Sequence, residues 1–250
     1  DLWLINGVAV RVPARLVARL ASRPDVESVR LDATVTAPAP ATGVAVAPDW
    51  NLSMIKANDL WTLGYTGQGI VVASMDTGVD IGHQDLGLNW RGGANSWFDP
   101  NNEHVSPADN NGHGTQTMGI AVGGSGIGVA PGARWIAVKI FNDAGVTNLS
   151  AIHQGFQWLL DPDGNPATDD APDVVNNSWG LLESLGTCNP EFQLDLQVLK
   201  AADIATVFSS GNDGPNPNTG LSPANYADNM SAGAVDATQA VANFSGRGPS

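Results

Sequence analysis

Four runs of apolar residues, each followed by polar residues, mark the middle of the chain. They are unbroken rather than alternating, and they are rich in Val, Ile and Ala. The runs lie at 70–75 (IVVASM), 135–141 (WIAVKIF), 174–175 with its flanks, and 205–208 (ATVF). Continuous runs of this kind are typical of parallel strands that are buried on both faces of a sheet.

Stretches with helical spacing of apolar residues lie between these runs, at 115–122, 149–160 and 192–202. Strands that alternate with helices indicate βαβ units, in which a helix carries the chain back to the start of the next parallel strand. We therefore predict an α/β fold with a doubly wound, mostly parallel sheet. In such folds the functional residues lie at the carboxyl ends of the strands.

The first 36 residues have a different pattern. Residues 4–12 (LINGVAVRV) and 26–35 (VESVRLDATV) alternate like half-buried strands, and 13–22 (PARLVARLAS) has helical spacing with Pro at its start. The pattern predicts a small α+β unit over 1–36, too short to be stable alone.

A linker separates this unit from the main domain, which we place at 50–250. Residues 37–49 (APAPATGVAVAPD) are rich in Pro and Ala. Such a composition indicates an extended, protease-accessible segment.

Composition narrows the function classes. The chain has 11 Lys and Arg against 25 Asp and Glu, a formal net charge of −14. No nucleic-acid partner is expected, because phosphate binding needs a basic surface. No apolar run reaches the roughly 18–20 residues that cross a bilayer, so no membrane partner is expected. Cys188 is the one cysteine, which excludes an internal disulfide and a cysteine-based metal site.

Three polar residues follow or precede the predicted elements at the expected edge of the sheet. Asp76 comes directly after the first buried run, and Asn212 comes shortly after the last. His113 lies between two glycines at the start of a predicted helix, where the backbone can approach a partner closely. A carboxylate can orient an imidazole, and an amide can donate to a developing oxyanion.

Each of these residues is a weak signal by itself. Asp-Thr-Gly also occurs around the carboxylates of aspartic proteases and phosphoryl-accepting proteins. A lone His is more often packed or exposed than catalytic, and Asn beside Gly is usually a turn residue.

Taken together, the motifs resemble those of the subtilisin-like serine proteases, the subtilases, whose triad runs in the order Asp, His, Ser. The resemblance covers nearly all of 50–250. Its motifs are 71–86 (VVASMDTGVDIGHQDL), 112–119 (GHGTQTMG), 128–131 (GVAP), 176–180 (NNSWG), 208–215 (FSSGNDGP) and 244–249 (FSGRGP).

The resemblance implies a serine endopeptidase that cleaves polypeptides through an acyl-enzyme and needs no cofactor for its chemistry. His113 would be the general base, Asp76 would orient it, and Asn212 would donate to the oxyanion.

Five further residues would bind substrate by the same resemblance: Ser178, Trp179, Gly180, Ser210 and Gly211. They belong to two segments that in the family line the primary specificity pocket or pair with substrate backbone. Trp179 stands where a smaller apolar residue is common. It either narrows a subsite or packs in the core, and the sequence leaves both open.

The serine motif of the family, Gly-Thr-Ser-Met-Ala, does not occur in the 250 residues. We expect a fragment of a longer protein that is inactive as it stands, with its nucleophile beyond residue 250. The alternative is a non-catalytic, peptide-binding pseudoprotease of the same fold. A doubly wound phosphate- or small-molecule-binding protein is disfavoured, because there is no Gly-rich phosphate loop.

No residue is assigned to a metal. Asp85 matches a calcium-binding carboxylate of the family, but the loop at 123–128 (GGSGIG) is short, and 161–170 (DPDGNPATDD) lacks EF-hand spacing. Structural calcium therefore stays open.

The resemblance also implies that 1–36 is the end of an inhibitory, chaperone-like pro-segment, with a processing site in 37–49. An unrelated small extension is the alternative. The parent would be a secreted, monomeric zymogen.

Overall fold

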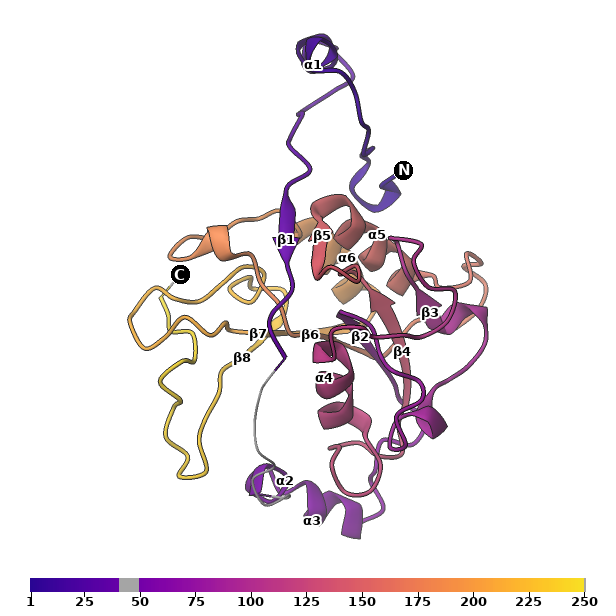
Figure 1. Ribbon diagram of the computed structural model, residues 1–250, viewed down its shortest axis with the longest axis vertical. Coiled ribbons are helices and arrows are strands. Elements are labelled where there is room, and N and C mark those ends of the chain that lie inside the picture. Colours follow the sequence, from indigo (N-terminus) through magenta and orange to yellow (C-terminus); the bar gives the residue numbers. More distant parts are fainter. Residues whose placement is uncertain (41–49, 250) are drawn as a thin grey trace.

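The computed structural model describes residues 1–40 and 50–249. At its centre lies a six-stranded sheet of order β3-β4-β2-β6-β7-β8, in which every neighbouring pair is parallel (Figure 1). The strands are β2 (Val71–Asp76), β3 (Trp97–Phe98), β4 (Arg134–Lys139), β6 (Val174–Asn177), β7 (Ala205–Ser209) and β8 (Met230–Ala232). The predicted parallel α/β sheet is confirmed, and its four predicted strands are β2, β4, β6 and β7.

Side chains of the central strands alternate between two cores. Met75 and Ile136 point to one face of the sheet, and Val72 and Trp135 point to the other. This follows from the period of two along a strand. Because both faces are covered, neither set needs to be polar, and this accounts for the unbroken apolar runs in the sequence.

Helices cover both faces, as a doubly wound sheet requires (Figure 1). Helices α5 (Leu149–Leu160) and α6 (Gln193–Ala201) pack on the Met75 face, and α4 (His113–Val122) packs on the Val72 face. Helix α5 lies close to the sheet at Gly155, where a Cβ would come within 2.7 Å of the Met75 Cε.

The remaining elements are short. They are η1 (Trp3–Ile5), α1 (Ala14–Ala21), β1 (Thr34–Thr36), α2 (Trp50–Met54), α3 (Ala57–Thr62), η2 (Gly87–Asn89), η3 (Ala94–Ser96), β5 (Val146–Asn148) and η4 (Leu182–Ser184). None of the described helices is both long and apolar enough to cross a membrane.

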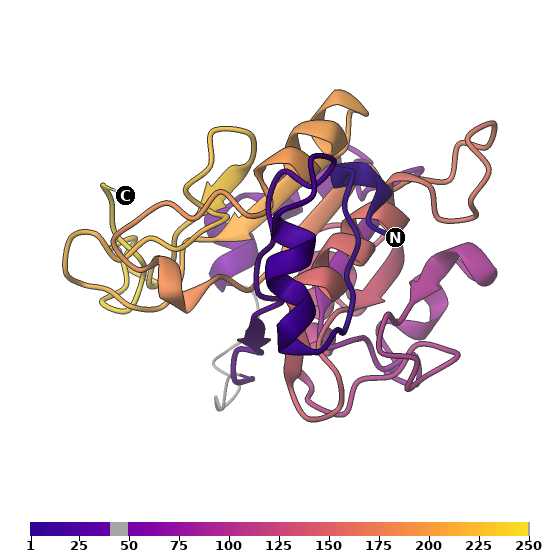
Figure 2. The ribbon, with the colours of Figure 1, turned by 90° about the horizontal axis from the view of Figure 1, so that it is seen from above.

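The N-terminal unit differs from the prediction. Residues 4–12 form no strand, and of 26–35 only the end is in β1. Helix α1 forms as predicted, but none of its side chains is buried, and it stands away from the main body (Figure 1). Seen from above, it overlies that body (Figure 2). Alternation alone does not make a strand, because a strand needs a partner for its backbone groups and a surface for its apolar face. β1 finds both on β5, to which it pairs antiparallel.

A buried histidine joins α5 to α6. His153, 2% exposed, lies with its Nδ1 3.0 Å from the carboxylate oxygens of Asp195, which is fully buried. Its Nε2 lies 3.3 Å from Oε1 of Glu191. Burial alone would lower the pKa of His153, but the hydrogen bonds and charges of the two carboxylates outweigh burial and raise the pKa to about 9.

This pKa predicts a pH-dependent contribution to stability. His153 is protonated in the folded protein up to about pH 9, whereas in the unfolded chain it loses its proton near 6.5. Its stabilisation is therefore complete below about pH 6.5 and is lost as the pH rises through about 9, by about 3 kcal/mol. Urea unfolding of the wild type and of His153→Gln should differ most at pH 6 and least at pH 9.5. The control is His83→Gln, at a histidine whose side chain is 40% exposed. An equal difference at both pH values would contradict the assignment.

Candidate active site

Asp76 and His113 meet at the carboxyl end of β2. The His113 Nδ1 lies 2.8 Å from Oδ1 of Asp76. Oδ1 also accepts the backbone N–H of Thr77 at 2.7 Å. The carboxylate is 1% exposed, whereas the imidazole side chain is 12% exposed. The buried carboxylate therefore fixes one ring nitrogen, and the other ring nitrogen is left for a reacting group.

Two glycines allow this approach. Gly112, just before α4, has φ of 95°, in the left-handed region that favours glycine. Gly114, in the first turn of α4, lies so close to the turn after β2 that a Cβ would come within 2.1 Å of the Gly78 carbonyl oxygen and 3.1 Å of the Asp76 Cβ. A larger residue at 114 would push the helix, and His113 with it, away from Asp76.

Asp109 is a member of the site that the sequence reasoning missed. Its carboxylate accepts the Thr77 hydroxyl at 2.9 Å, the Gly112 N–H at 2.9 Å, and both the N–H and the hydroxyl of Thr115, at 2.9 and 2.7 Å. It thus joins the turn after Asp76 to the first turn of the helix that carries His113. The available signal was an Asp just before a predicted helix, a position that favours capping.

The charges of these groups act on His113. Burial alone would lower its pKa, but the hydrogen bond and charge of Asp76, with a smaller effect from the charge of Asp109, raise the pKa above its ordinary value. Burial would raise the pKa of Asp109, yet the hydrogen bonds that its carboxylate accepts hold it below the usual range. Asp109 is therefore ionised wherever the imidazole titrates.

A buried lysine forms a hydrogen bond to the turn that follows Asp76. Lys139, at the end of β4, is fully buried, and its Nζ donates to the Thr77 carbonyl oxygen at 2.8 Å. The same ammonium lies 3.1 Å from Oδ1 of Asp143. Asp143 lies on the loop between β4 and β5, so this ion pair connects the Asp76 turn to that loop.

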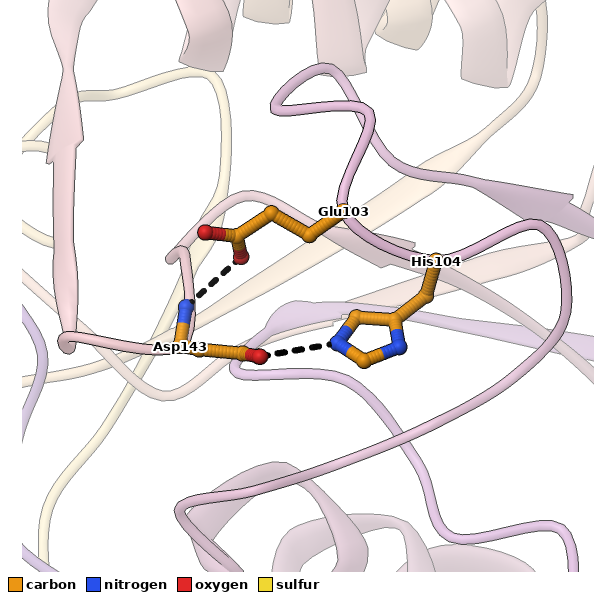
Figure 3. Close-up of side chains that lie close together, drawn as sticks. All are labelled: Glu103, His104 and Asp143. Carbon is orange, nitrogen blue, oxygen red and sulfur yellow. Dashed lines mark hydrogen bonds and ion pairs between the residues drawn. The ribbon is translucent and has the colours of Figure 1, made fainter.

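Asp143 also belongs to a cluster whose geometry could hold a cation (Figure 3). His104 Nε2 lies 3.0 Å from both carboxylate oxygens of Asp143, and Glu103 accepts the Asp143 N–H at 2.7 Å. The Asn110 side-chain amide donates to the Asp143 carboxylate at 2.7 Å. Together with Lys139, these groups supply hydrogen-bond donors to the carboxylates of Asp143 and Glu103. The cluster therefore stabilises the loop between β4 and β5.

The carboxylates predicted as uncertain calcium ligands lie in two places. Asp161, Asp163 and Asp170 come together at the surface, with oxygens within 4.8 Å of one another. Asp85 lies beside the 123–128 turn, where its carbonyl oxygen accepts the Gly124 N–H at 2.8 Å. The sequence assigns calcium to neither place, and structural calcium stays open.

Asn212 lies at the same edge of the sheet as Asp76. It follows β7, is exposed, and is separated from β2 by β6 alone. Two strand spacings place the ends of β2 and β7 about 10 Å apart. This is a span that one bound peptide could bridge.

The predicted substrate-binding segments face one another across a leucine that the sequence did not indicate. Ser178 and Gly180 follow β6, and Ser210 and Gly211 follow β7. Added Cβ atoms at Gly180 and at Gly211 would each come within 3.0 Å or less of Leu221 side-chain atoms. Leu221 therefore fills the space between the two segments.

Trp179 packs in the core. Its side chain is 2% exposed and meets the rings of Phe192 and Phe208 edge to face, with centroids 5.9 and 5.4 Å apart. Of the two interpretations that the sequence left open, core packing matches this position.

The Asp109 carboxylate generates a test. In Asp109→Asn the negative charge is lost, so we expect the pKa of His113 to fall, and the loss of acceptors should destabilise the fold by about 1–3 kcal/mol. An NMR titration of the His113 ring measures the first effect. Asp80→Asn, on a nearby loop, is the matched control, and an unchanged His113 pKa in Asp109→Asn would contradict the proposed coupling.

Comparison with known proteins agrees with this geometry. The model of the subtilase family matches residues 67–250. The chain is 35% identical to Bacillopeptidase F of Bacillus subtilis (strain 168), over 99% of this chain and 19% of the relative. It is 35% identical to M-protease of Shouchella clausii (strain KSM-K16), over 88% and 54%, and 32% identical to Subtilisin E of Bacillus subtilis (strain 168), over 98% and 60%.

The chain thus spans from about a fifth to three fifths of the length of these curated relatives. The family match covers most of the chain and includes both Asp76 and His113. The chain belongs to the subtilase family.

Proposed function

We propose that this chain is part of the precursor of a subtilisin-like serine endopeptidase, whose serine nucleophile lies beyond residue 250. The observation that carries the proposal is the buried Asp76 carboxylate bonded to His113 Nδ1 at 2.8 Å. The names of the relatives, among them M-protease and Subtilisin E, point to the same activity.

The geometry supports a distinct role for each side chain. With its Nδ1–H donated to Asp76, His113 presents the Nε2 lone pair as the proton acceptor for a serine hydroxyl. The serine oxygen attacks the peptide carbonyl, and His113 then returns the proton to the leaving amine. Asp76 stabilises the imidazolium that forms between these steps. The raised pKa of His113 suits it to carry that proton.

Asn212 is the proposed donor to the oxyanion. It is exposed at the end of β7, on the edge of the sheet that holds Asp76. Its amide can donate to the carbonyl oxygen as negative charge develops there. In subtilisin, removal of the corresponding donor costs about 100- to 1,000-fold in turnover.

Residues 1–36 are proposed to act as an inhibitory pro-segment. β1 adds to β5 as an antiparallel strand, with Val35 paired to Thr147, which is how extended peptides bind to a sheet edge. Val35 is 6% exposed and joins the apolar core on the α5 side. The segment thus occupies a strand edge that we propose to bind substrate.

Polar contacts along one side of α5 hold the same segment. Asp32 accepts the N–H and the hydroxyl of Ser150 at the start of the helix, at 2.9 and 2.8 Å. Arg30 lies 2.6 Å from Glu191, the partner of His153. Gln157, near the end of the helix, accepts the Leu4 N–H at 3.1 Å. These contacts support a dedicated binding mode rather than an unrelated extension.

On the same family grounds we propose that the parent is a secreted zymogen. It would act on polypeptides as a monomer, with no cofactor in the chemical step. The alternative, a pseudoprotease that binds peptides without cleaving them, requires a different residue at the serine position.

Substitution of His113 tests the catalytic proposal. In the full-length precursor, His113→Ala should abolish peptide hydrolysis and leave the precursor unprocessed, because the serine loses its base. His83→Ala removes an imidazole that is 40% exposed and lies outside the Asp76–His113 pair, and it should retain both activities. Peptide release by mass spectrometry and precursor size on gels are the measurements. Normal maturation of purified His113→Ala would refute the role of His113, and an inactive wild type would favour the pseudoprotease.

Addition of the pro-segment in trans tests its inhibitory role. A peptide of residues 1–38 should inhibit the mature enzyme. The Asp32→Asn peptide should inhibit more weakly, by roughly 10-fold, because a charge-assisted bond to the Ser150 N–H is lost. Asp25→Asn, whose carboxylate pairs with Arg23 within the segment, is the matched control. Equal inhibition constants for all three peptides would contradict the proposed binding mode.

A further inference from the structure

The hydrogen bonds of β1 fix the position of the chain on the β5 edge. Val35 is paired with Thr147 and Thr36 with Val146. The ladder continues one residue further, where the Ala37 N–H donates to the Gly145 carbonyl oxygen at 2.8 Å. Residues up to Ala37 are therefore held in a defined register on the β5 edge.

The next three residues carry the chain along the start of α4. Gly145 lies next to both Ala37 and Asn111: an added Cβ on this glycine would be 3.7 Å from the Ala37 Cβ and 3.9 Å from the Asn111 amide nitrogen. The Asn111 side-chain oxygen in turn accepts the backbone N–H of His113 at 3.2 Å. At residue 37 the chain thus lies close to the turn that precedes α4.

Pro40 also lies near the start of α4. It lines a pocket of about 550 Å³ with Asp109, Gly112 and Thr115, residues that flank His113 at the start of α4. The three peptide bonds between Ala37 and Pro40 therefore lie beside the start of α4, the helix that carries His113.

Chemistry separates these three bonds. Ala37–Pro38 and Ala39–Pro40 both have proline on the leaving side. The nitrogen of such a bond carries a ring carbon in place of hydrogen, and the ring crowds the approach of the imidazolium that must protonate it. The Pro38–Ala39 bond has an ordinary N–H on its leaving side. Pro38, on the acyl side of this bond, has no backbone N–H of its own. That missing donor lies away from the leaving nitrogen.

We propose that the first self-cleavage of the precursor occurs between Pro38 and Ala39. This inference rests on the proposed peptidase function and specifies where that function acts on its own chain. The serine oxygen bonds to the Pro38 carbonyl carbon, the bond to the Ala39 nitrogen breaks, and His113 transfers the serine proton to that nitrogen. Water then hydrolyses the Pro38 ester, which restores the serine and leaves a carboxylate on Pro38.

Mass spectrometry of the maturing full-length precursor tests this assignment. The earliest released N-terminal fragment should end at Pro38, and the earliest new N-terminus should be Ala39. Ala39→Pro turns every bond from 37 to 40 into one that precedes proline, so its first cleavage should be at least 10-fold slower. Ala39→Ser keeps an ordinary amide and should be processed like the wild type.

The outcomes separate the bond assignment from the peptidase function. A wild type that hydrolyses added peptides but first releases a fragment with another end overturns the assignment and leaves the function standing. If Ala39→Pro is processed as fast as the wild type, the bond assignment is likewise overturned and the peptidase function stands. A wild type that neither matures nor hydrolyses any peptide overturns both. A fragment ending at Pro38, together with slow Ala39→Pro and normal Ala39→Ser, supports both.

Discussion

The parallel pairing of β2 with its neighbours is the constraint on which the site depends. β4 and β6 run alongside β2 in the same direction, so the chain leaves all three strands at one edge. This edge receives Asp76 from β2, Lys139 from β4 and, one strand beyond β6, Asn212 from β7. An antiparallel neighbour would have put its corresponding residues at the opposite edge. The backbone ladder, rather than any contact between side chains, therefore collects the chemistry in one place.

Within that edge the fine geometry comes from dense local hydrogen bonding. Thr77 illustrates this. Its N–H holds the Asp76 carboxylate, its hydroxyl donates to Asp109 and accepts the Gly114 N–H, and its carbonyl oxygen accepts Lys139. Two segments that are distant from Thr77 in the sequence, one at 109–114 and one at Lys139, are thereby tied to this residue. The imidazole is held where the glycines of α4 allow the closest approach, so its position is rigid before any substrate binds.

The sequence predicted those elements whose burial determines the pattern of apolar residues. β2, β4, β6 and β7 are covered on both faces and read as unbroken apolar runs, and α5 was predicted at its observed bounds, 149–160. β3 was missed because it has two residues, and β8 because its side chains are exposed. The predicted strand at 4–12 was wrong because its alternating side chains find no partner strand; Val8 and Val10 are 64% and 62% exposed.

The site was predictable to a similar extent. Asp76 and His113 are carried by local motifs, and the structure joins them. Asp109 and Leu221 act through contacts between segments far apart in the chain, and no local pattern of residues marks such contacts. The geometric relation of Asn212 to the other two follows from strand order, which the sequence did not supply.

The covalent continuity of β1 with the chain that leads to α2 has a consequence for timing. While that link is intact, the strand on β5 is held at an effective concentration set by the tether, and mass action in solution cannot displace it. Once the link is cut, the same contacts at Ser150, Glu191 and Gln157 belong to a separate molecule. Occupancy of the edge then falls with dilution. After the cut, the complex of pro-segment and enzyme would therefore stay inhibited where it is concentrated and become active as it disperses.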